Sequence, residues 1–193
     1  MKKRVILIIT FLFILTTSIL IITMSLKRNT HIVVAGSFEG IFIVDVKDPL
    51  NPRQVGHLDT YNAYDVQVSG KYAYIADSNN GLVIVDVSDP TNPRQVGHLD
   101  TYNAYDVQVS GKYAYVADSN NGLVIVDVSD PANPKQVGYL DTDGGAIGVH
   151  VLNNYAYIAD DNNVLVIVDV SDPTNPFLVK DISWLTLYGL SGM

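Results

Sequence analysis

The sequence contains no cysteine among its 193 residues. Disulfide bridges, thiolate metal sites and cysteine nucleophiles are therefore excluded. A lipid-modified cysteine of the bacterial lipoprotein type is excluded as well. The redox compartment stays open, because many secreted microbial proteins fold without disulfides.

Basic residues are scarce beyond residue 30. Residues 31–193 hold seven Lys and Arg against all twenty acids, nineteen of which are Asp, so their formal charge is 7 − 20 = −13. Nucleic-acid affinity comes mainly from Lys and Arg side chains that displace counterions from phosphates. A domain with this balance repels a phosphate backbone, and we expect no nucleic-acid partner.

Sequence motifs of catalysis are also missing. The chain has no H-E-x-x-H pair and no G-x-S-x-G turn. Helical periodicity is absent after residue 30, so no glycine-rich loop leads into a phosphate-binding helix. Nothing here nominates an enzyme, and we expect no catalytic residue.

What the chain does contain is a unit of 41 residues, repeated almost without change. Residues 51–90 recur as residues 92–131, and only Ile75 against Val116 differs. A looser copy, GIFIVDVKDPLNP, precedes this pair, and another, YAYIADDNNVLVIVDVSDPTNP, follows it. Self-similarity at this period indicates a repeat architecture, in which each unit buries its apolar faces against its neighbours.

Each unit has the pattern of four β-strands. Residues 63–69 (AYDVQVS) alternate, residues 72–77 (YAYIAD) follow a tight turn, and residues 82–87 (LVIVDV) form an apolar run of strand length. An Asn-Gly dipeptide before this run supplies the positive φ angles of a hairpin turn. Residues 94–99 (RQVGHL) make a weaker fourth strand. Four antiparallel strands in tandem units are typical of propeller blades, so we expect an all-β propeller of about four four-stranded blades.

The most regular part of the unit is a pentapeptide. LVIVD stands at residues 82–86, 123–127 and 165–169, with IFIVD at 41–45, and each copy precedes a V-x-D-P-x-N-P turn. Over nearly all of residues 31–193 the chain resembles the LVIVD-repeat family. The resemblance implies a propeller on a bacterial or archaeal surface protein, usually one without an assigned activity, and it transfers no catalytic residue. We expect the Asp of each pentapeptide to be an acceptor for the turn that follows it.

The strand order leaves the first blade one strand short. The domain opens at residues 31–37, which have the pattern of a second strand, and residues 183–193 follow the last fourth strand. We expect residues 185–190 of this tail to supply the missing innermost strand and close a four-bladed ring. The alternative is an open, partial ring that pairs with another chain as a homo-oligomer or is a fragment.

A long uncharged run occupies the amino terminus. Residues 5–26 contain no charge, Gly or Pro, and a helix of this length spans about 33 Å, enough for a hydrocarbon core of about 30 Å. We expect a cytoplasmic basic segment at 1–4, a transmembrane signal-anchor helix at 5–26, a linker at 27–30 and an extracellular repeat domain at 31–193. The alternative is a cleaved signal peptide, whose apolar region is normally shorter.

Two kinds of loop are expected at one end of the propeller. They combine Tyr, Asn and Asp, a mixture found at recognition surfaces. The candidate interaction face comprises Asp59, Tyr61, Asn62, Asn79, Asp100, Tyr102, Asn103, Asn120, Asp143 and His150. We expect a non-catalytic module of the cell surface that binds a protein or a glycan. The alternatives are a structural or self-assembling envelope module with ordinary turns, and a metal-dependent lectin or enzyme at the channel mouth.

The lectin or enzyme alternative rests on irregularities in the last blade. His150 replaces a Gln of the earlier copies, and a one-residue insertion falls within residues 143–145. Drift of a terminal repeat explains both equally well. Residues 77–81 (DSNNG) have oxygen side chains at alternate positions, as calcium loops do, but lack the distal Glu. We therefore expect no cofactor, with calcium as the one candidate.

Overall fold

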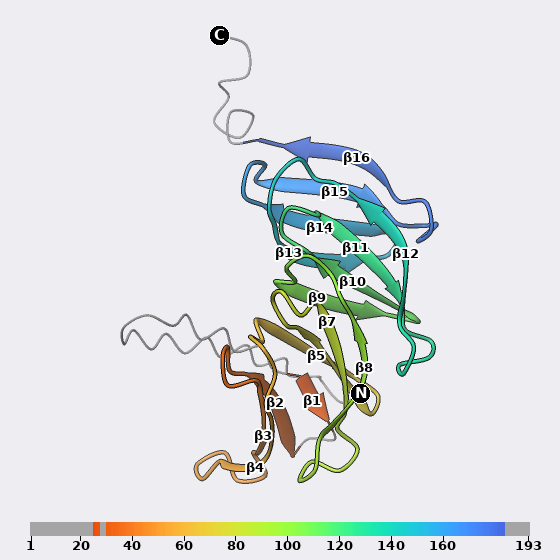
Figure 1. Ribbon diagram of the computed structural model, residues 1–193. Coiled ribbons are helices and arrows are strands. Elements are labelled where there is room, and N and C mark those ends of the chain that lie inside the picture. Colours follow the sequence, from red (N-terminus) through yellow and green to blue (C-terminus); the bar gives the residue numbers. More distant parts are fainter. Residues whose placement is uncertain (1–24, 28–29, 184–193) are drawn as a thin grey trace, which may run out of the picture.

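The computed structural model describes residues 25–27 and 30–183, and every regular element in that part of the chain is a β-strand (Figure 1). The strands form four antiparallel sheets, and each sheet takes its strands in chain order. The first sheet contains β1 (Ser25–Lys27), β2 (His31–Ala35), β3 (Ile41–Asp45) and β4 (Arg53–Leu58). The second contains β5 (Asp65–Ser69), β6 (Tyr72–Ala76), β7 (Leu82–Asp86) and β8 (Arg94–Leu99).

The other two sheets repeat this plan. The third sheet contains β9 (Asp106–Ser110), β10 (Tyr113–Ala117), β11 (Leu123–Asp127) and β12 (Lys135–Leu140). The fourth contains β13 (Ala146–Leu152), β14 (Tyr155–Asp160), β15 (Leu165–Asp169) and β16 (Phe177–Ile182). The expected four-stranded antiparallel sheets are confirmed, and they have the construction of propeller blades.

Local sequence explains the hairpin between the second and third strands of the repeat. Gly81 has φ +71°, and a Cβ at this position would overlap the backbone oxygen of Leu99, so only glycine fits. The amide of Asp77 donates to the Gly81 oxygen at 2.8 Å and closes the turn. The predicted Asn-Gly turn is therefore confirmed at its glycine, whereas the second positive φ belongs to Ser78 and not to Asn80.

The core lies between the sheets. Each sheet has a forward face, which in the second sheet carries Tyr74, Ala76, Leu82 and Ile84, and a rear face, which there carries Ala73, Ile75, Val83 and Val85. The forward face of the first, second and third sheets packs on the rear face of the sheet that follows. Apolar side chains on both faces of the third strand explain the continuous run in LVIVD.

The four sheets follow one another in a row (Figure 1). Their innermost strands contact each other in chain order, β1 and β2 with β5, β5 with β9, and β9 with β13. The first and the fourth sheet lie at opposite ends of the row. In the described residues the row is therefore open, as in the alternative of a partial ring.

The prediction for the first sheet was wrong in its innermost strand. That place, beside β2, is taken by β1, in which Ser25 pairs with Val33 and Lys27 with His31. The sheet thus begins before residue 31, and the position that the carboxyl-terminal tail was expected to fill is occupied. Residues 185–190 of that tail lie outside the described residues.

The expected membrane segment also needs a correction at its end. Ser25 and Leu26, which were expected to finish the transmembrane helix, and Lys27, which was expected to open the linker, form β1 instead. Residues 5–24 lie outside the part that the structure describes. Within that part, no helix has the length and apolar character needed to cross a membrane.

Candidate functional site

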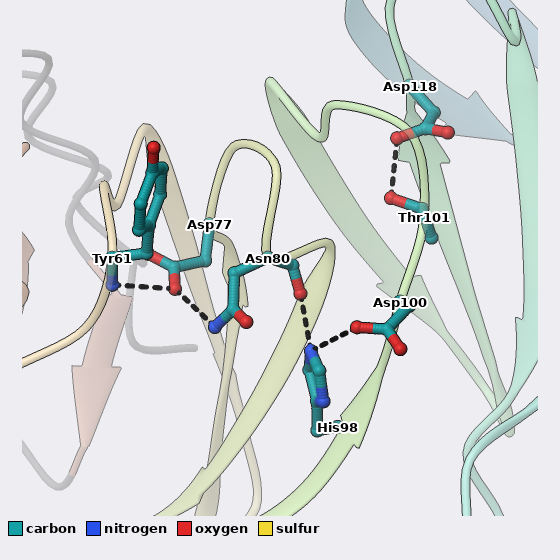
Figure 2. A network of polar contacts seen from close by, with 7 residues as sticks. All are labelled: Tyr61, Asp77, Asn80, His98, Asp100, Thr101 and Asp118. Atoms are coloured by element: carbon teal, nitrogen blue, oxygen red, sulfur yellow. Dashed lines mark hydrogen bonds and ion pairs between the residues drawn. The ribbon is translucent and has the colours of Figure 1, made fainter.

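A buried aspartate organises each pair of loops on the side where the candidate residues lie. Asp77 is completely buried at the end of β6. One of its oxygens, Oδ1, accepts hydrogen bonds from the Thr60 hydroxyl (2.6 Å) and the Asn62 amide (2.8 Å). The other, Oδ2, accepts from the Tyr61 amide (3.0 Å) and the Asn80 side chain (2.8 Å) (Figure 2). Four donors from two loops therefore converge on one carboxylate, which fixes both loops.

The third sheet repeats this arrangement almost atom for atom. Asp118 is completely buried and accepts from the Thr101 hydroxyl (2.5 Å), the amides of Tyr102 (2.9 Å) and Asn103 (2.9 Å), and the Asn121 side chain (2.9 Å). In the fourth sheet Asp160 takes the same place, with the Thr142 hydroxyl at 2.7 Å. The first sheet has Gly36 there and lacks the carboxylate.

Two tyrosines project from the loops that these aspartates hold. The side chains of Tyr61 and Tyr102 are 60% and 56% exposed, although their own amides are bound to buried carboxylates. Figure 2 shows the ring of Tyr61 pointing away from Asp77. An aromatic ring on an ordered backbone offers contact area at a small cost in conformational entropy.

Histidines lie beside the aspartates at the start of the same loops. The Nε2 of His98 donates to the backbone oxygen of Asn80 at 2.6 Å and lies 3.2 Å from the carboxylate of Asp100 (Figure 2). His57 does the same with Glu39 and Asp59, at 2.6 Å and 3.4 Å. The aspartates themselves stay exposed, so each can still accept a hydrogen bond from a ligand.

The predicted interaction face needs one removal. Asp59, Tyr61, Asn79, Asp100, Tyr102, Asn120, Asp143 and His150 are exposed and Asn103 is partly exposed. Asn62 is only 5% exposed, because its backbone amide donates to the buried carboxylate of Asp77 in the second sheet. Asn103 is also committed within the protein, since its side-chain oxygen accepts from the Ser78 hydroxyl at 3.0 Å.

A polar hollow joins two of the predicted residues. It has a volume of about 370 Å³ and lies at the junction of the third and fourth sheets. Its lining consists of Asn120, Asp141, Asp143, Gly144, Gly145, Asp161 and Asn162. The one-residue insertion noted in the sequence falls in this lining, and Asp143 there has φ +62°. His150 does not line the hollow, so the structure does not bring it together with Asp143.

His150 has a place in a different series of residues. In the inner strands, Asp and Gln side chains bond to the next sheet: Asp106 accepts from the Val149 amide (2.8 Å) and Gln108 from the Val151 amide (2.6 Å). Asp65 and Gln67 bond to the third sheet in the same way. Gly148 and His150 stand at these positions in the fourth sheet. His150 is thus the end of an intersheet ladder in the described row.

The sequence prediction missed a pair of neighbouring aspartates, Asp65, which is buried, and Asp106, which is partly buried. Burial, together with a hydrogen bond and repulsion from the neighbouring Asp65 carboxyl, raises the pKa of Asp106 to about 8. The amides of Val107 and Val149 oppose this rise only in part. Only the regular recurrence of Asp at this strand position signalled the pair, because the strands in which they lie are 41 residues apart.

The aspartates of the LVIVD pentapeptides have the expected structural role. Asp45, Asp86, Asp127 and Asp169 each accept from the amide two residues later, at 2.8–2.9 Å. These bonds form the turn before the fourth strand. Among the residues that the structure describes, no group of three or more His, Asp or Glu is placed to hold a metal ion.

Comparison with known families gives one result that covers most of the chain. The family described as LVIVD repeat matches residues 62–101, 103–142 and 143–183. Each match runs from the loop before a first strand to the end of a fourth strand, so a match coincides with one sheet. Comparison with curated proteins gives no match.

Proposed function

Because this chain belongs to the LVIVD repeat family, we propose that it is a non-catalytic binding module that holds a protein or a glycan on the loop side of its sheets. The observation that carries the proposal is the pair of exposed tyrosines, Tyr61 and Tyr102, on loops fixed by buried aspartates. A binding surface built in advance loses little conformational entropy when it meets its ligand. The two loops are copies, which suits a ligand with repeated chemical groups.

The surroundings of the tyrosines supply the polar part of such a site. Asp59 and Asp100 are exposed acceptors, and Asn79 and Asn120 are exposed amides that both donate and accept. At such surfaces, aromatic rings commonly stack on the ligand, and neighbouring carboxylates and amides orient it through hydrogen bonds. The charge of −13 beyond residue 30 favours a neutral or basic ligand over an anionic polymer.

Residues 5–24 carry the second part of the proposal. We propose that this uncharged run anchors the chain in a membrane and that the sheets stand outside the cell. The support is the length of the run, with basic residues on both sides of it. Protease protection on intact cells tests the topology. Cleavage of the sheets in intact cells is expected, and full protection until lysis contradicts an outside location.

The binding proposal is tested by replacing both tyrosines in the full chain. The Tyr61→Ala and Tyr102→Ala double variant and the unchanged chain are compared on a panel of defined oligosaccharides and immobilised envelope proteins. We expect the unchanged chain to bind at least one probe and the double variant to bind it about 30-fold more weakly, because loss of an aromatic anchor costs about 2 kcal/mol or more.

A matched control is available in Tyr139. This tyrosine is 46% exposed and lies on β12, at the position that His98 has on β8, outside the two loops that carry Tyr61 and Tyr102. Tyr139→Ala is expected to leave binding unchanged. Equal binding by the double variant and the unchanged chain contradicts the proposed site, whereas equal loss in the Tyr139 variant shows that any exposed tyrosine matters and the loops do not.

A further inference from the structure

The forward face of the fourth sheet is an apolar surface that nothing in the described row covers. In the second sheet, Leu82 and Ile84 on this face are completely buried by the third sheet. Their counterparts Leu165 and Ile167 are partly exposed. The same face carries Tyr155, Val179 and Phe177, which are 39%, 48% and 54% exposed. An exposed apolar area of this kind on a soluble surface marks an interaction site.

The rear face of the first sheet, at the other end of the row, is also incompletely covered. Val34, Phe42 and Val44 on this face are partly exposed. Their counterparts in the second sheet, Ile75, Val83 and Val85, are completely buried by the first sheet. The described row of sheets therefore has an incompletely covered apolar face at each end, a rear face on the first sheet and a forward face on the fourth.

The interior of the chain shows how two such faces fit. Three times a forward face packs on a rear face, and the fourth strand then lies against a proline turn of the following sheet. At that point Gly56, Gly97 and Gly138 leave no room for a side chain beside the oxygens of Pro90, Pro131 and Pro173. The two faces at the ends of the chain have the residue types of this interface.

The ends depart from the repeat in the fourth strand and in the proline turn, the two elements that meet at each junction within the chain. Phe177 stands on the forward edge where the other sheets have Arg53, Arg94 and Lys135. Leu50, 88% exposed, stands in the proline turn of the first sheet, where the other turns have Thr91, Ala132 and Thr174. Both exchanges replace polar or small residues by large apolar ones, one at each end of the chain.

A third departure from the repeat, Lys180, affects the spacing and the charge of such a contact. Lys180 stands where the first three sheets have glycine. Because a Cβ at the glycine positions would overlap the proline turn of the next sheet, the proline turn of a second copy would have to stand further from this strand than the turns within the chain do. The turn that would arrive carries Asp48, which is exposed and acidic. Lys180 and Asp48 are therefore complementary in charge.

We propose that the forward face of the fourth sheet binds the rear face of the first sheet of a second copy of this chain. The contact is head to tail and joins the same two kinds of face that meet three times within one chain, with a wider gap at Lys180. A head-to-tail contact joins different surfaces of the two copies, so it closes into a ring or extends as a filament according to the rotation between copies. This inference goes beyond the binding of a ligand on the loop side and does not depend on it.

Engineered cysteines test the contact, and the absence of natural cysteine removes any background. Two full-length chains are prepared in mild detergent, one with Leu50→Cys and one with Phe177→Cys. Both residues are exposed, so neither change disturbs the core. The chains are treated with a short bismaleimide, separately and mixed, and separated under denaturing conditions. We expect at least tenfold more cross-linked dimer in the mixture than in either chain alone.

Leu178→Cys is the matched control. Leu178 is 51% exposed, close to the value for Phe177, but pairs with Val168 and so belongs to the rear face. Its mixture with the Leu50→Cys chain is expected to give no more dimer than either chain alone. Dimer formed by the Phe177→Cys chain alone means that two fourth sheets meet and overturns the proposal. Absence of mixed dimer, or equal dimer with Leu178→Cys, overturns it too.

Discussion

Aspartate, which supplies nineteen of the twenty acids in this chain, does different work at different places in the repeat. Asp86 and its copies are partly exposed acceptors in a turn. Asp77 and Asp118 are buried anchors of two loops. Asp106 lies on an inner strand beside Asp65, with its carboxyl largely withdrawn from water. The same side chain therefore forms turns, anchors loops and, at Asp106, serves as a partly buried acid with a raised pKa.

Asp106 makes the stability of the protein depend on pH in an unusual direction. Because the folded protein holds this proton up to about pH 8 and the unfolded chain releases it near pH 4, the group favours folding fully below pH 4 and loses that contribution as pH rises from 4 to 8. Relative to an Asp106→Asn variant, which cannot ionise, the unchanged protein should lose several degrees of melting temperature between pH 5 and pH 8.5. Circular dichroism melts at both values measure the difference.

Asp172 provides the control for this experiment. Hydrogen bonds from Thr174 hold the pKa of its exposed carboxyl below the usual value, so it is ionised throughout that pH window. Asp172→Asn should therefore keep a constant difference from the unchanged protein. A constant difference for Asp106→Asn as well would show that Asp106 carries its charge in the folded protein already at pH 5.

The sequence predicts the aspartates that form turns better than it predicts the buried aspartates that anchor loops. The turn acceptors were predicted because donor and acceptor lie two residues apart, as in Asp86 with Ser88. Asp77 was assigned only to a loop with some likeness to calcium sites, since its donors Thr60, Tyr61 and Asn62 lie 15–17 residues away. Their convergence depends on how the sheets pack, which no local pattern records. For the same reason Asn62 was wrongly placed on the surface.

At the scale of single elements, the fourth strand and the proline turn of the next sheet form a matched pair. Gly97 lies against the backbone of Pro131, and its Cα has no space for a further carbon. Glycine in a strand often marks such a close approach. The fourth strand is thus fixed in place by the sheet that follows it.

Gly97→Ala should therefore lower the free energy of unfolding markedly, although it replaces only one hydrogen by a methyl group. We expect a loss of about 1–3 kcal/mol, because the backbone of the turn must move to admit the Cβ. Urea unfolding followed by circular dichroism measures it. Lys180→Ala, at the same position in the fourth sheet, should be nearly neutral, and similar losses in both variants would show that the turn does not press on Gly97.

The strands themselves were mostly predictable, because alternation, apolar runs and turn residues are local signals. Sixteen strands are present in the described residues, and fifteen of them match predicted ones. The exception is β1. Its first two residues, Ser25 and Leu26, are the end of an apolar run that has the pattern of a membrane helix. That pattern concealed a short strand that only its pairing with β2 defines.

At the scale of the whole molecule, the described part of the chain is an open row of stacked sheets. Within the described residues, the buried clusters join each sheet to its neighbours in sequence, and the stability of such arrays is close to a sum of units and the interfaces between them. The end units then have one interface each and the inner units have two. Closure into a ring was not predictable from the repeat, because identical units fit an open row and a closed ring equally well.

The stack predicts unequal costs for identical substitutions. Ile84→Ala should destabilise the protein by about 2–5 kcal/mol, because Ile84 is completely buried between two sheets. Ile167→Ala, the same change in the fourth sheet, should cost less than half as much in dilute monomer, because Ile167 is partly exposed. Urea unfolding compares the two. Equal costs would mean that something covers the fourth sheet within one chain.

The second and third sheets are built from nearly identical sequence, and the loop before each is held by the same hydrogen bonds to a buried aspartate. Removing or duplicating one unit of 41 residues therefore leaves every surviving junction as it was and alters only how far the two chain ends stand apart. Recombination between the two matching stretches of the gene would therefore lengthen or shorten the row by one sheet at a time.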